Sequence, residues 1–381
     1  MTARILNIES RRRKNRIGIV CPTDFHFSER DTIDAQAVIE SPNISLYCLD
    51  HECQRALFVE TPADVDLSQT PFYYQAQYEN TVGLFAVPYE ELHRLANDIR
   101  IDSKCLILIY SVGRSGSTLL SSALNQVENI VSLSEPDIYA QLVAIREWDG
   151  SNDAEVSELL QSCTKVLCKS HKQSSFPFTW AIKFRGYGIE IADLMFKHFP
   201  DAKTIFLYRD VETWLKSAVR AFVHDDINSA EYLAAMQASL SPLVPLIDKH
   251  FSEKGVSLSI AKMGTLMWLS VMECYLKLNQ QDAPMLAVRF KELISLPKQA
   301  IEEVFKYCDI PTTDLEVVFK ILDRDSQAGT VISWANIQKN PVELPDDFMA
   351  EVERTLLEHP KIRTPHFVVP NTWCPDIAEE C

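Results

Sequence analysis

The residues best suited to chemistry form a short loop of small and polar side chains, SVGRSGST at positions 111–118. The apolar run at 105–110 precedes this loop and is short and rich in branched residues, which is typical of a buried parallel strand. Residues 119–124 follow with apolar side chains at helical spacing. A strand, a small-residue loop and a helix point several backbone N–H groups and a helix N-terminus at one place. The loop therefore predicts a phosphate site.

The loop differs from the common nucleotide-binding loops. A Walker A loop, GxxxxGK[ST], supplies a lysine to the β- and γ-phosphates and a hydroxyl group to Mg²⁺. In this sequence Ser117 stands at the lysine position, and Arg114 is the cation of the loop. A glycine-rich dinucleotide fingerprint is also missing. A P-loop kinase stays as an alternative that the missing lysine disfavours.

A second strand, loop and helix follow later in the chain. Residues 202–208 (AKTIFLY) predict a buried strand, and the next nine residues read RDVETWLKS. Arg209 leaves the C-terminal end of this strand, where a guanidinium can bind a phosphate through two N–H groups. Ser217 lies two turns into the next helix and faces back toward the strand end. Two anion sites suit a ligand that carries two separate phosphate groups.

Together, the two motifs resemble those of sulfotransferases that use PAPS (3′-phosphoadenosine 5′-phosphosulfate). The family's 5′-phosphosulfate loop reads P-[KR]-[ST]-G-[ST]-[ST], so Gly113 replaces a proline. Its 3′-phosphate motif reads R-[DN]-x-x-[DE]-x-x-x-S, and both the arginine and the serine are present. The resemblance covers roughly residues 104–330 and implies PAPS as cofactor, PAP as product and no metal. It implies cofactor contacts from Arg114, Ser115, Gly116, Ser117, Thr118, Arg209 and Ser217.

The same resemblance implies the catalytic residues. Sulfuryl transfer, by analogy with phosphoryl transfer, needs cations near the bridging oxygen and a base near the acceptor. Lys183 lies 26 residues before Arg209, and Glu135 lies 21 residues after Arg114. Tyrosylprotein sulfotransferases place their catalytic lysine and their glutamate base at these offsets. The resemblance therefore implies Lys183 and Arg114 as catalytic cations and Glu135 as the general base.

A histidine competes with this glutamate for the role of base. The tripeptide Lys169-Ser170-His171 resembles the K-[TS]-H of cytosolic small-molecule sulfotransferases, in which the histidine is the base. The family's distance between lysine and arginine fits Lys183 and leaves Lys169 too early in the chain. The spacing therefore favours Glu135, with His171 as the alternative.

A late polar loop, DRDSQAGT at 323–330, provides further candidates. Sulfotransferases often return a late loop over the nucleotide, so the resemblance implies cofactor contacts from Arg324 and Ser326. The R-K-G-x-x-G signature of the cytosolic enzymes is missing here. An ordinary surface turn is an equal alternative.

Strand and helix patterns alternate after residue 101, which predicts an α/β fold with a parallel P-loop sheet flanked by helices. We expect residues 101–381 to form the PAPS-dependent sulfotransferase domain. Residues 1–100 predict a small N-terminal α+β lobe. Its expected strands and helix lie at 16–20, 44–49, 56–59, 82–87 and 89–99. The basic run at 11–14 is expected to be a solvated tail.

The composition restricts the partners. The net charge of −16 argues against nucleic acid and favours a neutral or cationic acceptor over an anionic one. No apolar stretch reaches the length of a membrane span, and no apolar segment of a secretion signal follows the basic run. Ten scattered cysteines without paired spacing favour reduced thiols. We therefore expect a cytoplasmic protein with no membrane partner, and the sequence gives no indication of its oligomeric state.

These observations predict the transfer of a sulfuryl group from PAPS to a hydroxyl group or an amine of a small-molecule acceptor. A cationic natural product of secondary metabolism fits the acidic charge. The non-enzymatic alternative is a sulfotransferase-like module that binds the nucleotide without turnover.

Overall fold

The computed structural model describes residues 2–13, 15–169, 178–222, 229–254, 258–311, 315–330, 332–337 and 343–375. The chain divides into two compact units, which are described separately. Unit 1 comprises Met1–Leu106, Glu128–Lys183 and Ile191–Ala202. Unit 2 comprises Ile107–Val127, Phe184–Glu190 and Lys203–Cys381. The domain boundary that the sequence predicts near residue 100 stays a prediction.

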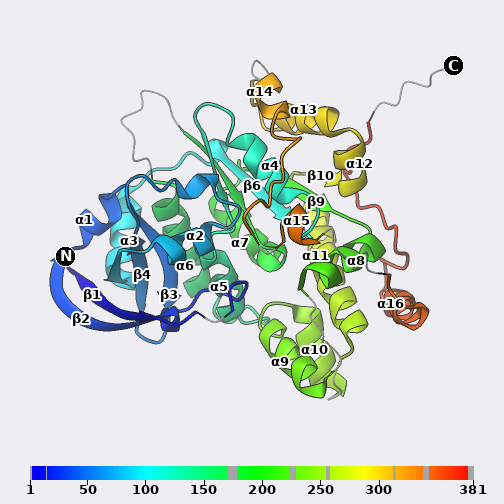
Figure 1. The fold of residues 1–381 in the computed structure, drawn as a ribbon, viewed down its shortest axis with the longest axis horizontal. Helices are drawn as coiled ribbons and strands as arrows, with labels where there is room; N and C mark the ends of the chain where they lie inside the picture. The colour runs from blue at the N-terminus through cyan, green and yellow to red at the C-terminus, as the bar shows by residue number, and fades with distance from the viewer. Residues whose placement is uncertain are drawn as a thin grey trace. The chain divides into compact units, whose positions relative to one another are not determined.

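Unit 1 contains an antiparallel sheet with the strand order β2-β1-β5-β4-β3 (Figure 1). Its strands are β1 (Thr2–Arg11), β2 (Phe25–Asp34), β3 (Ile44–Asp50), β4 (Arg55–Glu60) and β5 (Gly83–Pro88). The helices α1 (Ala35–Glu40), α2 (Tyr73–Asn80) and α3 (Tyr89–Asp98) belong to the same part of the chain, with short 3-10 turns at Pro22–Asp24, Leu67–Gln69 and Ser103–Cys105. The expected strands at 44–49, 56–59 and 82–87 and the helix at 89–99 are confirmed.

The expected strand at 16–20 is wrong, because this segment forms a turn between two long strands. Those strands, β1 and β2, escaped the sequence analysis. Most of their side chains are exposed, and β2 buries only Phe25 among its ten residues. A strand with so few buried positions lacks the apolar alternation by which strands are recognised.

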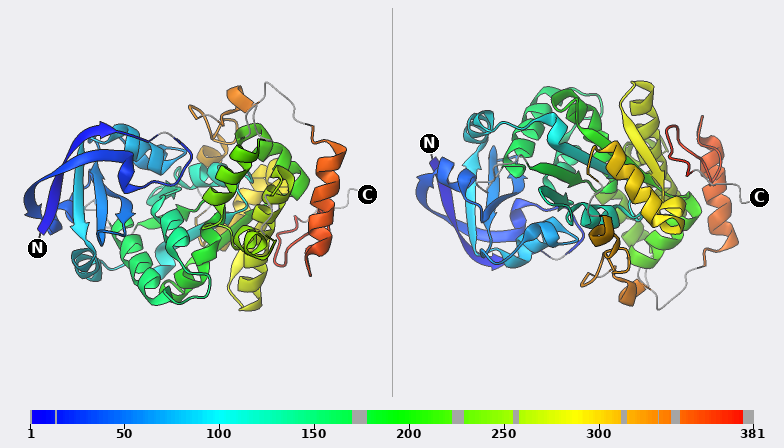
Figure 2. Two further views of the ribbon diagram at one scale, coloured as in Figure 1. Left: turned by 90° about the horizontal axis from the view of Figure 1, so that it is seen from below. Right: turned by 90° about the horizontal axis from the view of Figure 1, so that it is seen from above.

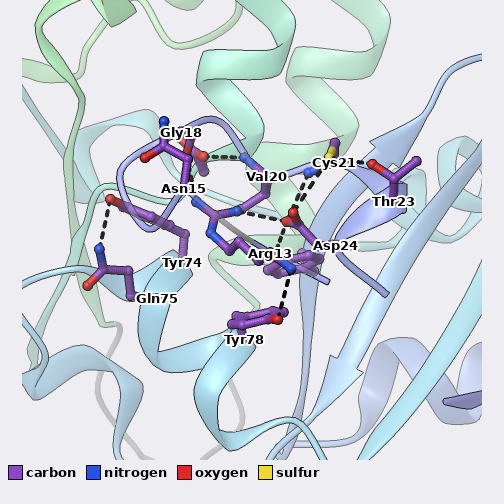
Figure 3. Close-up of polar contacts among 12 residues, drawn as sticks. Arg13, Asn15, Gly18, Val20, Cys21, Thr23, Asp24, Tyr74, Gln75 and Tyr78 are labelled. Atoms are coloured by element: carbon purple, nitrogen blue, oxygen red, sulfur yellow. Dashed lines mark hydrogen bonds and ion pairs between the residues drawn. The ribbon is translucent and has the colours of Figure 1, made fainter. Parts of the chain in front are cut away.

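The basic run at 11–14 is not a solvated tail, because Arg13 lies in the interior of unit 1. Its guanidinium Nη1 lies 2.7 Å from Asp24 Oδ2, and the two side chains are only 3% and 7% exposed. The guanidinium carbon also lies 5.2 Å from the centroid of the Tyr74 ring (Figure 3). Lys14 lies outside the described residues. A run of basic residues is expected to be solvated unless a buried carboxylate pairs with one of them. Here Asp24 pairs with Arg13, and the sequence did not reveal this ion pair.

The remainder of unit 1 is built from strands and helices of the α/β type. Strands β7 (Ile130–Ser134) and β8 (Thr179–Lys183) pair in parallel. The helices are α5 (Ile138–Ile145), α6 (Asp153–Leu167) and α7 (Ala192–His198), the last preceded by a 3-10 turn at Gly186–Ile191.

Unit 2 contains strands β6 (Leu106–Ser111), β9 (Lys203–Tyr208) and β10 (Met285–Arg289), and β9 pairs in parallel with both of the others. Within unit 2 the strand order is β10-β9-β6. All six residues of β6 are buried, as expected for a parallel strand covered on both faces. The predicted α/β fold with a parallel sheet flanked by helices is confirmed.

Ten helices belong to unit 2, within the ranges that the structure describes (Figure 2). They are α4 (Ser117–Leu124), α8 (Val211–Phe222), α9 (Ala230–Leu240), α10 (Pro245–Lys254), α11 (Ile260–Gln280), α12 (Phe290–Ser295), α13 (Pro297–Tyr307), α14 (Leu315–Phe319), α15 (Trp334–Ile337) and α16 (Asp346–Glu358). In the described part of the chain, no helix combines the length and the apolar character needed to cross a membrane.

Candidate active site

The predicted phosphate loop joins the end of β6 to the start of α4 in unit 2. Gly116 has a φ of 86°, and a Cβ atom there would lie 2.5 Å from Leu293 Cδ2. Both the backbone conformation and the space therefore require glycine at this position. Arg114 also has a positive φ, of 51°, which is uncommon for a residue with a side chain. Such a conformation persists only where surrounding contacts fix it.

Contacts with the second motif fix this loop. The Ser115 hydroxyl donates to the Leu207 carbonyl at 3.1 Å, and the Val112 amide donates to the same oxygen at 3.1 Å. The indole N–H of Trp214 donates to the Val112 carbonyl at 2.7 Å. Leu207 is near the end of β9 and Trp214 is in α8, so the elements that carry the second motif also hold the first.

The two predicted phosphate motifs exchange hydrogen bonds and form one cluster. Arg114 Nε donates to Ser217 Oγ at 3.0 Å. In the other direction, Arg209 Nη1 donates to the Arg114 carbonyl at 3.1 Å. The sequence analysis named all three residues as cofactor contacts, and the structure brings them together.

Two further contacts orient the Arg209 guanidinium, and the sequence analysis missed both. Its Nε donates to Thr213 Oγ1 at 3.0 Å, and its central carbon lies 4.3 Å from the centroid of the Phe290 ring. Thr213 lies four residues after Arg209 in the same motif, a spacing that places it one helical turn away. Phe290 is distant in sequence, and no local pattern indicates it.

The cluster has an excess of positive charge. Burial and the nearby Arg114 lower the pKa of Arg209 to about 10. Burial and Arg220 lower the pKa of Arg114, although Asp325 partly offsets them. Within the described ranges, neither Arg114 nor Arg209 forms an ion pair with a carboxylate. Buried cations that face one another make a site suited to an anion.

The late loop approaches the phosphate loop through a residue that the sequence analysis did not select. Gln327 Nε2 donates to Thr118 Oγ1 at 2.7 Å. Arg324 is exposed and Ser326 is half-buried, and neither side chain has a hydrogen bond to another described residue. Gln327 lies next to Ser326. The sequence therefore indicated the loop, but no pattern in it indicated which residue of the loop makes this contact.

Unit 1 holds the predicted catalytic pair. Lys183 Nζ donates to Glu135 Oε1 at 2.5 Å, and the side chains are only 3% and 15% exposed. The Glu135 amide donates to the Lys183 carbonyl at 2.8 Å. Lys183 ends β8 and Glu135 follows β7, and because these neighbouring strands are parallel, their carboxyl ends meet at one edge. Glu135 has a positive φ of 62°, a second uncommon conformation at a predicted site residue.

The segment that carries Glu135 is attached to the N-terminal part of unit 1. Ser134 Oγ donates to the Pro71 carbonyl at 2.6 Å. Asp137 Oδ2 accepts from the Val20 amide at 2.7 Å. The residues on both sides of Glu135 thus have fixed partners, which holds the carboxylate in place.

The competing tripeptide is only partly described. His171 lies outside the residues that the structure describes. Lys169 Nζ donates to the carbonyls of Ser41 and Ile44, each at 3.1 Å, and also to that of Ile39. Burial lowers the pKa of Lys169 to about 7. This lysine therefore has backbone partners around the end of α1 within unit 1.

A family model described as "Sulfotransferase family" matches residues 107–314, more than half of the chain. This chain belongs to that family. Among curated proteins, no sequence match is found.

Solved structures of sulfotransferases also resemble this chain at low identity. The sulfotransferase from Alicyclobacillus acidocaldarius is 14% identical, with 65% of this chain and 89% of that chain covered and a TM-score of 0.40. Sulfotransferase STF9 from Mycobacterium avium is 14% identical, with coverage of 71% and 79% and a TM-score of 0.40. Mouse sulfotransferase SULT7A1, complexed with PAP, is 12% identical, with coverage of 71% and 88% and a TM-score of 0.37.

Proposed function

We propose that this chain is a PAPS-dependent sulfotransferase that modifies a hydroxyl group or an amine of a small-molecule acceptor. The observation that carries this proposal is the cluster of Arg114, Arg209 and Ser217, in which two phosphate motifs are joined by hydrogen bonds. Membership of the sulfotransferase family supports it and leaves little reason to consider a P-loop kinase.

The residues present fit a ligand with two phosphate-type groups. Arg209 and Ser217 would hold the 3′-phosphate, and the loop from Ser115 to Thr118, with the N-terminus of α4, would hold the 5′ side. The lowered pKa of Arg209 supports this assignment, because a bound phosphate offsets the repulsion from Arg114. Arg324 and Ser326 stay candidates for the outer part of this site. PAPS, when bound, supplies an activated sulfuryl group.

Glu135 and Lys183 are the proposed catalytic pair. As the acceptor oxygen or nitrogen bonds to sulfur, it loses a proton, which Glu135 accepts. The buried ion pair with Lys183 presents Glu135 as a carboxylate, the form that can take this proton. Lys183 and Arg114 are the cations proposed to stabilise the charge that develops on the leaving group. His171 remains the alternative base.

We propose the kind of acceptor from the net charge of the chain, and the cellular compartment from its free cysteine thiols. The net charge of −16 favours a neutral or cationic small molecule, such as a cationic natural product. Nine cysteines lie among the described residues, and all nine are free thiols, which supports a reducing compartment such as the cytoplasm.

Nucleotide binding and turnover together test this function. Calorimetry should show metal-independent binding of PAP that exceeds the binding of ATP with Mg²⁺. Incubation with labelled PAPS and a panel of cationic, neutral and anionic acceptors should then transfer label to a small molecule. Binding of PAP without transfer to any acceptor would instead favour the nucleotide-binding module.

A further inference from the structure

The C-terminal segment, residues 365–373, extends the sheet of unit 2. The Trp373 amide donates to the Ala287 carbonyl at 2.8 Å, and the Ala287 amide donates to the Asn371 carbonyl at 3.2 Å. Ala287 and Thr372 form a parallel bridge, so the C-terminal segment pairs with β10. Figure 2 shows this part of the chain in red, after α16. The segment is therefore docked by backbone hydrogen bonds.

The docked segment contacts the residues on both sides of Arg209. Tyr208 immediately precedes Arg209, and its hydroxyl donates to Thr372 Oγ1 at 2.8 Å, while Thr372 donates to the Val369 carbonyl at 2.7 Å. Beyond Arg209, the Val211 amide donates to the Pro365 carbonyl at 3.3 Å. Contacts before and after this arginine restrict the backbone from which its side chain extends.

Asp210, the next residue, has a partner at each of its carboxylate oxygens. One carboxylate oxygen accepts from Arg289, at 3.1 Å from Nε and 2.6 Å from Nη2. The other oxygen lies 3.1 Å from Nδ1 of His366, which belongs to the C-terminal segment. A carboxylate beside a phosphate-binding arginine would compete for that arginine or repel the phosphate. Arg289 and His366 occupy the two oxygens of Asp210, which weakens the competition of this carboxylate for Arg209.

The backbone of Arg209 itself is also fixed. Its carbonyl accepts from the Trp268 indole N–H at 2.8 Å. The backbone is thus hydrogen bonded at residues 209 and 211, and the side chains of residues 208 and 210 have partners as well. Preorganisation of this kind raises affinity because less freedom is lost on binding.

We propose that the C-terminal segment positions the 3′-phosphate site. Its residues Pro365, His366 and Thr372 contact the residues on both sides of Arg209, and its docking sets how strongly the protein prefers a nucleotide with a 3′-phosphate. The inference rests on the proposed function, because it assigns the 3′-phosphate to Arg209. The residues of the C-terminal segment are positioning residues and touch no ligand in this assignment.

Two substitutions at one position test the docking. Trp373→Pro removes the amide that donates to Ala287, whereas Trp373→Ala removes the indole and keeps that amide. We expect Trp373→Pro to bind PAP about tenfold more weakly than Trp373→Ala, a loss typical of one or two hydrogen bonds. Both variants should bind AMP, which lacks the 3′-phosphate, within about twofold of the original protein. Calorimetry with PAP and AMP measures both quantities.

A milder pair of variants applies if the proline variant fails to fold. Tyr208→Phe removes the hydrogen bond to Thr372, and Thr372→Val removes that bond together with the one from Thr372 to the Val369 carbonyl. Each should weaken PAP binding by about threefold to tenfold, and the double variant should lose no more than Thr372→Val alone. The exposed Val368 is 51% accessible, and Val368→Ala serves as a control with unchanged affinity.

These results distinguish the positioning role of the C-terminal segment from the proposed function of the protein. Equal losses of PAP and AMP affinity, or equal PAP affinity in the proline and alanine variants, would overturn the positioning role. A wild-type protein that binds AMP as well as PAP would reject the proposed function itself. A selective loss of PAP affinity supports both.

Discussion

Buried cations are treated differently in the two units of this chain. In unit 1, Arg13 forms an ion pair with Asp24, and Lys183 forms one with Glu135. In unit 2, the half-buried Arg114 and Arg209 lie close to each other and form no ion pair with a carboxylate among the described residues. A buried charge needs a partner. We propose that a bound anion completes the second pair.

The pKa shifts follow the same contrast. Burial acts to lower the pKa of Arg13, but Tyr47 and Asp24 outweigh it, and the pKa is raised. For Arg209 burial acts together with Arg114, and the pKa falls to about 10. Arg289 in unit 2 is paired with Asp210, so the contrast belongs to the phosphate cluster and not to the whole unit.

The largest expected effect concerns the carboxylate of the proposed catalytic pair, Glu135. Glu135→Gln keeps the size of the side chain and removes the proton acceptor, so turnover should fall by about 10²–10⁴. PAP affinity should stay within about twofold, because the phosphate cluster is untouched. Steady-state rates and calorimetry measure the two quantities. If Glu135→Gln keeps full turnover, Glu135 is not the base, and His171 becomes the candidate.

The next largest effect is expected when the ion pair between Arg13 and Asp24 in unit 1 is removed. Asp24→Ala leaves the Arg13 guanidinium buried without its carboxylate, which should lower the free energy of unfolding by about 3–5 kcal/mol. The exposed Asp31 on β2 provides a matched control, and Asp31→Ala should change stability by about 0.5 kcal/mol or less. Denaturant unfolding compares the two variants. Equal, small losses would mean that Arg13 needs no internal partner.

A third effect concerns Lys169, whose partners are carbonyls instead of a carboxylate. Burial lowers its pKa from 10.5 to about 7, so between these values the folded chain binds fewer protons than the unfolded chain. The free energy of unfolding should therefore rise with pH through this window, by at most about 1.4 kcal/mol per pH unit from this group.

Denaturant unfolding at several pH values measures this slope. Lys169→Met should flatten this slope. Lys165→Met, within the last turn of α6, should not. A slope that survives unchanged in Lys169→Met would show that a group other than Lys169 causes it.

The smallest expected effect has the opposite sign. Arg114→Gln removes one of two repelling cations, so the ligand-free protein should gain about 1 kcal/mol of stability. The same variant should lose most of the stabilisation that PAP gives to the original protein. Thermal unfolding with and without PAP measures both. A destabilised variant would mean that Arg114 already has a sufficient partner in the protein.

The sequence predicted the parts of the site that lie in local patterns. Arg114, Arg209 and Ser217 belong to two strand–loop–helix motifs whose residue order determines their position. The late contact of Gln327 with Thr118 joins residues 209 positions apart, and that of His366 with Asp210 joins residues 156 apart. Such contacts depend on tertiary packing, which a single sequence does not reveal.

The fold shows the same limit. Buried strands such as β6 and β9 carry continuous apolar runs and were predicted within one or two residues. The largely exposed strands β1 and β2 carry no such pattern, and the burial of Arg13 depends on partners that only the folded chain assembles.

The central claim is that the Arg114–Arg209–Ser217 cluster binds PAP. Calorimetric titration of PAP without divalent metal, into the original protein and into Arg209→Ala, tests it most directly. We predict micromolar binding that weakens by about 100-fold or more in the variant, because a charge-assisted pair of hydrogen bonds is lost. Stronger binding of ATP with Mg²⁺ than of PAP, or equal PAP affinity in Arg209→Ala, would contradict the account.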